Sequence, residues 1–398
     1  MKLDQQSTTQ LNVPEKETII ELNDRVHLVR RKTIFLLLTF FAIAGASFGF
    51  FKYKGLKQHA APITSPSSTD LPKVSFYHWR TVYQPGEVSL NRLMEMNSDR
   101  LYLRLFEITI DELENSWYQR PTPQATLIFK QKPSLPIAPV IYIDLSVFRS
   151  WEYKVADLSA KLVKRVMDIA QVHELKLVQE LHLDCDWTPS TQKAFFNLVA
   201  AVKKQLPSDW QLVVTLRLDQ FKNFTATGVP PADKGVLMAY NMGDLRKPGP
   251  HNSILDLNTA RQYLKIWKQY PLPLDVALPL FSWVVVFDDQ DNFQGLLRSI
   301  PKELENRQYS RNIELNLFKV EQSFTTPEGW QVPVGWTLRL EESRPDDLMA
   351  VAELLGKAVP ANQYLIFYHL DDSLLTNWPA KVLNDIAYQI GQSRGQFK

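Results

Sequence analysis

Two carboxylates close together at the end of one apolar segment are the residues of this chain best suited to chemistry. The stretch Val178–Pro189 (VQELHLDCDWTP) has the composition of a strand that ends in Asp184 and Asp186, followed by a Trp and a helix start. Side chains two apart on a strand face the same way, so Asp184, Asp186 and Thr188 should share one face. Acids are costly to bury without partners, so the pattern indicates a functional site.

The elements that position these acids follow from the apolar periodicity of the chain. Four segments with apolar residues at three-to-four spacing predict helices, and they alternate with β-rich runs, which predicts a parallel sheet. Eight such runs predict a (β/α)8 TIM barrel, in which sites lie at the C-terminal ends of the strands. A doubly wound open sheet is the alternative, but the Gly-rich first turn of that fold is missing. The runs are Val74–Tyr83, Arg100–Ile108, Ile137–Phe148, Leu177–Trp187, Gln211–Leu218, Gly235–Met242, Leu274–Phe287 and Tyr364–Leu370; the helical segments are Lys154–Val172, Thr191–Leu206, Thr259–Gln269 and Asp346–Ala358.

One interval interrupts the alternation of strands and helices. Strand-like segments at Asn312–Val320 and Trp330–Leu340 lie between the seventh run and the helix before the eighth. We therefore expect a small β-rich insertion after strand seven, over about residues 284–345 of a barrel domain that covers residues 73–398. This insertion is expected to form a wall of the active-site cleft.

The ends of the predicted strands carry aromatic rings, carboxylates and amides, a mixture that suits a sugar. Flat apolar sugar faces stack on rings, and sugar hydroxyls need donors and acceptors. We therefore expect a carbohydrate polymer or an oligosaccharide as the ligand. The catalytic candidates are Asp184, Asp186 and, at the end of the third strand, Asp144; the substrate-binding candidates are Trp79, Tyr142, Trp187, Arg217, Tyr240, Asn241 and Trp283.

Several of these residues also suit a purely structural role. Arg104 or Arg217 is equally suited to neutralise Asp184 inside the barrel. Thr188 precedes Pro189, which is typical of a helix N-cap with Pro at the first helical position. Trp187 and Trp283 suit the core as well as they suit a ligand site.

Residues 33–51 (TIFLLLTFFAIAGASFGFF) are an uncharged run of 19, close to the ~20 residues that a membrane-spanning helix needs. We expect residues 1–32 to be a cytoplasmic tail, 33–51 a transmembrane anchor and 52–72, rich in Pro, Ser and Lys, a linker. Basic residues before the run favour a cytoplasmic N-terminus. The chain would then cross the inner or cytoplasmic membrane once and place its C-terminal domain in the periplasm or outside. A cleaved signal peptide is the alternative, since Ala44-Gly-Ala46 suits cleavage.

Composition narrows the classes of function. The chain has 398 residues and a net charge of +2 without a long basic run in its body, so we expect no nucleic-acid partner. Its one cysteine, Cys185, excludes an intrachain disulfide. Neither zinc-ligand spacing nor a phosphate-binding glycine motif is present. We therefore expect no metal and no cofactor.

These residues resemble those of family 18 glycoside hydrolases, the chitinases and their relatives. That family carries Asp-x-x-Asp-x-Asp-x-Glu on its fourth strand, often with Trp before the Glu. The octet here is Leu181-His-Leu-Asp-Cys-Asp-Trp-Thr188, which keeps the two later Asp and the Trp. The sixth strand, Met238-Ala-Tyr-Asn241, is similar to the Met-x-Tyr-Asp of the family, and Ala277-Leu-Pro-Leu-Phe281 is similar to its Gly-x-Pro-x-Tyr. The likeness extends over most of 73–398 and implies a barrel that acts on a polysaccharide.

The same comparison shows a departure at the catalytic position. In that family the Glu protonates the glycosidic oxygen, and the Asp two before it orients the acetamido group of the substrate. Thr188 stands at the Glu position and cannot act as a general acid at neutral pH. The resemblance therefore implies Asp186 as the acetamido-facing residue, Asp184 as its support and Tyr240 as a hydrogen-bonding partner of the substrate.

The chain also resembles a family of bacterial envelope proteins, often predicted to be lipoproteins, whose activity is not established. The segments that carry this likeness are Asp184–Thr188, Gly228–Pro231 and Tyr240–Gly243. This resemblance implies the cell envelope as the location.

Three functions remain open on the sequence. The first is a glycan hydrolase in which Asp186 works with Asp144 or Glu107, since glycosidases place two carboxylates ~5–9 Å apart. The second is a sugar-binding barrel without activity, and the third is an assembly barrel that docks a partner through an apolar patch. A carboxylate that faces Asp186 without a neutralising arginine would favour the enzyme. Arg104 or Arg217 paired with both acids would favour the binding or structural role.

Overall fold

The computed structural model describes residues 71–110, 120–149, 154–265, 269–304, 306–327, 329–359 and 361–394. The expected tail (1–32), the anchor (33–51) and the linker up to residue 70 lie outside these ranges. No helix formed by the described residues has the length and apolar character needed to span a bilayer.

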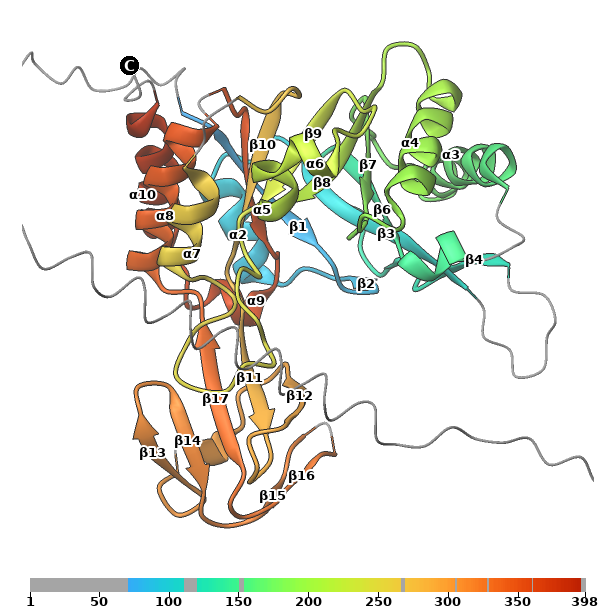
Figure 1. The fold of residues 1–398 in the computed structure, drawn as a ribbon. Helices are drawn as coiled ribbons and strands as arrows, with labels where there is room; N and C mark the ends of the chain where they lie inside the picture. Colours follow the sequence, from blue (N-terminus) through green and yellow to red (C-terminus); the bar gives the residue numbers. More distant parts are fainter. Residues whose placement is uncertain are drawn as a thin grey trace, which may run out of the picture. The chain divides into compact units, whose positions relative to one another are not determined.

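Eight parallel strands form a closed barrel, as the sequence predicted (Figure 1). Seven parallel pairings run from β1 round to β3, and the pairing of Tyr77 in β1 with Tyr102 in β3 closes the ring. The alternative of an open, doubly wound sheet is therefore wrong. In the order of the ring, the strands are β1 (Lys73–His78), β18 (Tyr364–Tyr368), β10 (Leu274–Pro279), β9 (Lys234–Met238), β8 (Gln211–Arg217), β7 (Glu180–Asp184), β6 (Ile137–Ile143) and β3 (Leu101–Ile110).

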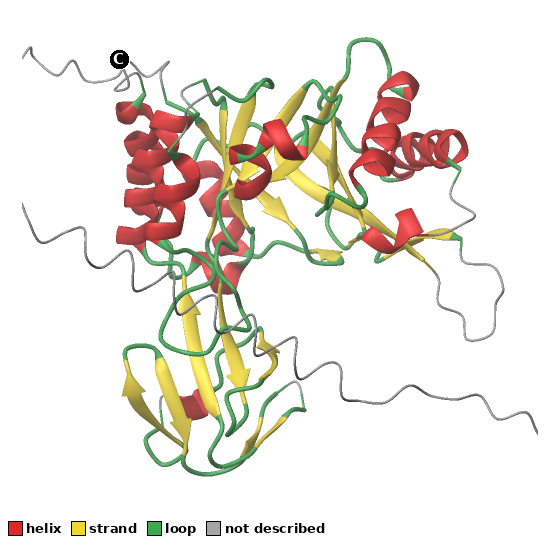
Figure 2. Ribbon diagram, in the orientation of Figure 1, coloured by secondary structure: helices red, strands yellow, loops and turns green. Residues whose placement is uncertain are grey.

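Helices cover most of the outside of the barrel (Figure 2). The four predicted helices are α3 (Val155–Val172), α4 (Gln192–Gln205), α7 (Leu257–Leu264) and α8 (Pro345–Ala358). In α3 the buried residues Leu158, Leu162 and Val166 recur at the spacing of one helix face, and that face packs on the sheet. The other helices are α2 (Glu87–Glu95), α5 (Leu218–Lys222), α6 (Phe224–Thr227), α9 (Asp372–Leu375), α10 (Ala380–Ser393) and the 3-10 turn η1 (Leu145–Arg149).

The connection between β3 and β6 differs from the regular pattern. Its described residues form β4 (Pro121–Gln124), which pairs antiparallel with β3, and β5 (Ile128–Phe129), which pairs with β2 (Val82–Tyr83). In the described part of this connection, residues 120–136, strands therefore stand where the barrel pattern places a helix.

A β-rich insertion stands between β10 and β18, where the sequence predicted one (Figure 1). Its five-stranded antiparallel sheet has a small core of its own, which includes Val284, Val286 and Leu338. The sheet strands are β11 (Ser282–Phe287), β12 (Phe293–Leu297), β13 (Ser310–Glu314), β14 (Leu317–Val320) and β17 (Thr337–Glu342); β15 (Phe324–Thr325) pairs with β16 (Gln331–Val332), and η2 (Lys302–Leu304) is a 3-10 turn.

Candidate functional site

Asp184 is the last residue of β7, and its carboxylate lies inside the barrel. The side chain is buried, and Oδ1 accepts a hydrogen bond from the hydroxyl of Thr215 on β8 at 2.5 Å. Among the described residues no cation forms an ion pair with it. Burial raises the pKa of Asp184, and the nearby charge of Asp186 adds to the increase, while Thr215 and Arg104 oppose it; the result is a pKa of about 7. The carboxyl group therefore gains and loses its proton near neutral pH.

Asp186 lies two residues further along and faces solvent. Its side chain is 51% exposed, and the nearest cation is Nε of Arg217 at 3.8 Å, too long for a hydrogen bond. Arg217 instead donates from Nη2 to the carbonyl of Trp187 at 3.0 Å. Asp186 is therefore a loosely paired carboxylate at the mouth of the barrel.

Neither candidate arginine neutralises both acids. Arg104 donates from Nη1 to Oε2 of Glu107 at 2.8 Å, and its guanidinium lies over the ring of Trp79 at 5.4 Å. Arg217 contacts Asp186 alone of the two acids. The arrangement that would have favoured the binding or structural role, one arginine paired with both acids, is not observed among the described residues.

Asp144 follows β6 and is half-buried. Its Oδ1 accepts a hydrogen bond from the backbone N–H of Ser146 at 2.8 Å, so part of its role is to begin the turn η1. Tyr142 on β6 is paired with Asp184 on β7, and Asp144 follows Tyr142 two residues later. Burial raises the pKa of the Tyr142 hydroxyl, and the charges of Asp186, Asp144 and Asp184 raise it further. The structure thus places the three predicted carboxylates at the ends of two neighbouring strands.

Aromatic rings line the inside of the mouth next to these acids. Trp79 contacts Tyr77 and Tyr368 with ring centroids 5.9 Å and 5.7 Å apart, and it lies 6.5 Å from Tyr142. Tyr240 lies 5.8 Å from Tyr368. The predicted residues Trp79, Tyr142 and Tyr240 therefore belong to one half-buried cluster, with faces and edges of the kind that pack on sugars.

Trp187 is not at the mouth of the barrel. Its side chain is 1% exposed and packs on Phe195 and Phe196 of α4, so it belongs to the core between sheet and helices. The reason is strand alternation, which turns the residue after Asp186 to the outside of the barrel. Thr188 also differs from expectation: α4 begins at Gln192 with Thr191 at the N-cap.

Trp283 and Asn241 lie at the rim. Trp283, on β11, is partly buried, contacts Phe281 at 5.1 Å and donates from Nε1 to Glu341 at 2.7 Å. Asn241 is exposed and adopts a positive φ of 53°. Trp283 contacts Phe281, and Asn241 follows Tyr240 in the chain. Since Phe281 and Tyr240 contact each other, both residues lie next to the aromatic cluster.

Tyr77, Tyr368 and Thr215 also belong to the site; Thr215 and Tyr368 lie at predicted strand ends, and the sequence reasoning missed Tyr77. Strand alternation could have identified Tyr77. It lies two residues before Trp79 and so shares its face, whereas His78 points the other way. His78 bonds the carbonyl of Val82 at 3.0 Å. The partnership of Thr215 with Asp184 joins residues 31 apart in the chain, and no local pattern predicts such a contact.

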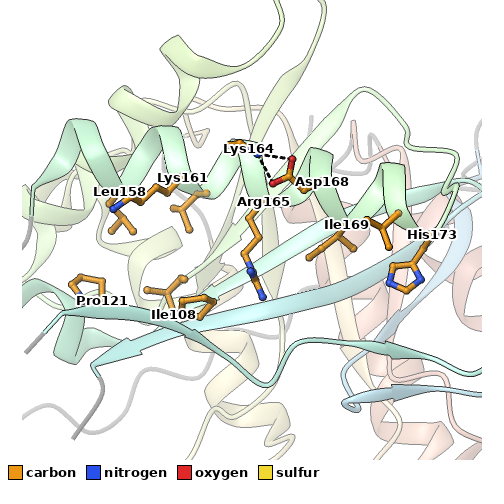
Figure 3. Close-up of a pocket in the computed structure, with 12 residues that line it drawn as sticks. Ile108, Pro121, Leu158, Lys161, Lys164, Arg165, Asp168, Ile169 and His173 are labelled. Atoms are coloured by element: carbon orange, nitrogen blue, oxygen red, sulfur yellow. Dashed lines mark hydrogen bonds and ion pairs between the residues drawn. The ribbon is translucent and has the colours of Figure 1, made fainter. Parts of the chain in front are cut away.

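A groove of about 380 Å³ lies outside the barrel, between α3 and the pair β3–β4 (Figure 3). Ile108, Pro121, Leu158 and Ile169 line it, and the side chain of Arg165 reaches into it. The groove is thus separate from the cluster of acids. Among the described residues no group of three His, Cys, Asp or Glu side chains has the geometry to hold a metal ion.

No protein family and no curated protein matches the sequence. Similar solved structures include the spore cortex-lytic enzyme SleL of Bacillus cereus (16% identity, 79% of this chain and 74% of that one, TM-score 0.44) and a chitinase from Chromobacterium violaceum ATCC 12472 (14%, 77% and 97%, 0.41). A third is a chitinase from Bacteroides thetaiotaomicron (11%, 82% and 99%, 0.47). The chain thus has a closed, eight-stranded parallel barrel and is similar to solved chitinase and SleL structures.

Proposed function

We propose that this protein is a membrane-anchored, glycoside-hydrolase-like barrel that binds a polysaccharide of the cell envelope at the mouth of the barrel. The observation that carries the proposal is the exposed Asp186 above the buried Asp184, beside the rings of Trp79, Tyr142 and Tyr240. Rings bind the apolar faces of a sugar, and carboxylates accept hydrogen bonds from its hydroxyl and amide groups.

The anchor and the location belong to the same proposal. The uncharged run of residues 33–51, flanked by basic residues, supports a single membrane-spanning segment with the barrel on the outer side of the membrane. Cell fractionation should place the full chain in the membrane pellet, with the barrel open to protease from the non-cytoplasmic side. Recovery of a soluble form that begins near Ser47 would support a cleaved signal peptide instead.

Hydrolysis of the same glycan is the second candidate, and the protonation of Asp184 favours it. A carboxyl group with a pKa of about 7 holds a proton near neutral pH, as a general acid must. Asp184 would then supply the proton, with Asp186 and Asp144 as the carboxylates that face the glycan. Hydrolysis would then follow a bell-shaped pH profile, and activity without any dependence on Asp186 would contradict this candidate.

The decisive experiment compares Asp186→Asn with wild type on a glycan array and in a hydrolysis screen against peptidoglycan and oligosaccharides of N-acetylglucosamine. We expect the variant to lose binding, whereas its thermal stability should change by less than about 1 kcal/mol because the Asp186–Arg217 pair is solvent-exposed. Asp289→Asn, an exposed carboxylate on the insertion, is the matched control and should bind as wild type does. Equal binding by wild type and Asp186→Asn would contradict the proposal.

A further inference from the structure

A fully buried ion pair lies on β17 of the insertion, and the carboxylate cluster does not use it. Nε of Arg339 and Oε1 of Glu341 are 2.7 Å apart, and both side chains are 0% exposed. A buried ion pair contributes little net stability, because desolvation offsets the attraction between its charges. Both residues of the pair also form hydrogen bonds with groups outside the insertion, which indicates a role beyond the insertion itself.

The guanidinium of Arg339 binds the loop that follows β9. It donates to the backbone carbonyl groups of Leu245 at 3.0 Å, of Lys247 at 2.6 Å and of Gly249 at 3.2 Å. One planar, rigid group with several donors can hold three carbonyls at once, which a lysine cannot do. The tip of this loop is therefore fixed to the insertion.

The base of the same loop continues into the barrel mouth. Two backbone hydrogen bonds close it: Asn241 N–H to the carbonyl of Ile254 at 2.8 Å, and Gly243 N–H to the carbonyl of Ser253 at 3.1 Å. Gly243 is required there, because a Cβ at this position would lie 2.9 Å from the Cα of Ser253. The loop 241–253 is thus closed at one end next to Tyr240 and clamped at the other by Arg339.

Glu341 joins this loop to the strand β11. Its Oε2 accepts from the hydroxyl of Ser253 at 2.5 Å and from Nε1 of Trp283 at 2.7 Å. One carboxylate therefore connects the loop that carries Asn241 with the strand that carries Trp283. Asn252 adds a bond from Nδ2 to the carbonyl of Glu342 at 2.7 Å.

We propose that Arg339 and Glu341 are positioning residues of the barrel-mouth site: they fix the loop 241–253 and Trp283 relative to each other and so set where Tyr240 and Trp283 meet an oligosaccharide. The inference rests on the proposed function for its ligand, but the positioning itself is a property of the chain alone. It makes the insertion a part of the binding site, although neither of its two key residues touches the ligand.

The test replaces both charges with apolar groups of similar size, Arg339→Met together with Glu341→Leu, in the full-length protein. Removing both partners of a buried pair leaves no unpaired charge, so the thermal midpoint should fall less than in either single variant. Some loss is expected, because the three loop carbonyls and the donors of Ser253 and Trp283 lose their partners. The position of Tyr240 is followed by fluorine NMR of protein labelled with 3-fluorotyrosine, with the resonance assigned by Tyr240→Phe. Affinity is measured with the tetrasaccharide of N-acetylglucosamine and with the monosaccharide.

We expect the Tyr240 resonance to move or broaden, and affinity for the tetrasaccharide to fall about tenfold with a smaller loss for the monosaccharide, because a misplaced wall costs most for a ligand that spans both sides. The single variant Arg339→Lys keeps the positive charge, but it should not keep the position of the loop 241–253. Arg311→Gln, in the exposed pair with Glu321 on the same sheet, is the control and should change neither measurement.

An unchanged Tyr240 resonance in a folded double variant would overturn the positioning role, whatever the ligand. If the double variant does not fold, Ser253→Ala, which removes only the hydroxyl donor to Glu341, replaces it with the same expected results. If wild type binds neither sugar, the proposed function fails, and the fluorine spectra alone decide the positioning role.

Discussion

The most informative single residue is Asp184, because its environment and its protonation are linked. It is surrounded by the barrel interior, its one hydrogen-bond donor in the described structure is Thr215, and a second acid follows two residues later. Water would stabilise the charged form, and burial removes that water, so the neutral form is favoured. A carboxylate with a purely structural role would be more stable in its charged form next to a cation, and Asp184 has no such partner among the described residues.

The raised pKa of Asp184 predicts how stability depends on pH. The folded carboxyl group has a pKa of about 7, above the ~3.9 of an unfolded aspartate. The folded state therefore binds the extra proton between these values, so stability from this group is complete below pH ~4 and is lost as pH rises to ~7. Asp184→Asn should stabilise the protein at pH 8, on the order of a few kcal/mol, and change little at pH 4.

Thermal melts of wild type and Asp184→Asn at the two pH values measure this difference. Thr215→Val is the comparison, since it removes the donor to the charged form and should raise the pKa further. A variant that is less stable than wild type at pH 8 would show that the folded protein holds Asp184 as a charged group.

At this scale the sequence predicted the acids better than their partners. Asp144, Asp184 and Asp186 were predicted from strand ends, and they lie at the ends of the neighbouring strands β6 and β7. Trp187 was predicted to bind substrate because it follows Asp186. Strand alternation instead turns its side chain outward, into the core between sheet and helices. Contacts such as that of Thr215 with Asp184 depend on which strands pair, and a local pattern does not contain that information.

At the scale of elements, periodicity predicted the eight barrel strands and four of the covering helices. It predicted long, amphipathic segments because a buried face must repeat at 3.6 residues in a helix. Short pieces such as α5, α6 and β5 were missed, since a few residues carry no period. The helices α2 and α10 were also missed, although α10 has 14 residues and a buried face. The N-cap of α4 was predicted at Thr188, but the chain makes one more turn before Gln192.

The two tryptophans that suited either the core or a ligand site now allow a paired prediction. Trp187 packs between β7 and α4, so Trp187→Ala should cost about 3–5 kcal/mol of stability. Trp283 is partly buried at the rim, so Trp283→Ala should weaken binding of the tetrasaccharide more than it lowers the melting temperature. Melts and binding isotherms of both variants check this, and a stability loss for Trp283→Ala as large as that for Trp187→Ala would assign it to the core as well.

At the scale of the whole barrel, the two ends differ in how their charges are paired. The end opposite the candidate site holds well-paired groups: Nη1 of Arg100 lies 3.1 Å from Oε1 of Glu180, whose Oε2 lies 3.2 Å from Nε2 of His182. Lys234 forms an ion pair with Asp275 in the same layer. Among the described residues at the site end, Asp184 and Asp186 lack a close cation, whereas Glu107 and Asp371 are paired with Arg104 and Arg80. The lower end of such barrels typically provides stability.

The paired end predicts a second, opposite dependence on pH. Burial alone would raise the pKa of Glu180, but His182, Lys234 and Arg100 together lower it to about 2. The stability that this group contributes is present above the unfolded value of ~4.3 and is lost as pH falls toward 2. Glu180→Gln should therefore destabilise the protein at pH 7 by about 3 kcal/mol.

The loss for Glu180→Gln should shrink as the pH approaches 2, because wild type then also carries a neutral group. Urea unfolding at pH 7 and pH 3 measures the effect, with Glu174→Gln, an exposed acid paired with Lys132, as the control. A loss that does not depend on pH would mean that packing of the side chain, and not its charge, provides the stability.

The strand β4, which the described residues between β3 and β6 form beside β3, has a consequence for local motion. The helices α4 and α5 pack on β8, so opening the sheet at β8 exposes buried apolar surface of both sheet and helices. In contrast, β4 and the outer half of β3 border the groove of about 380 Å³. Regions with less buried apolar surface open at lower free energy. Amide hydrogens of β4 and of Thr109 and Ile110 should therefore exchange with deuterium faster than those of β8, and equal protection would contradict this. Although backbone hydrogen bonds close the barrel all the way round, we expect local opening of the sheet to begin at β3 and β4.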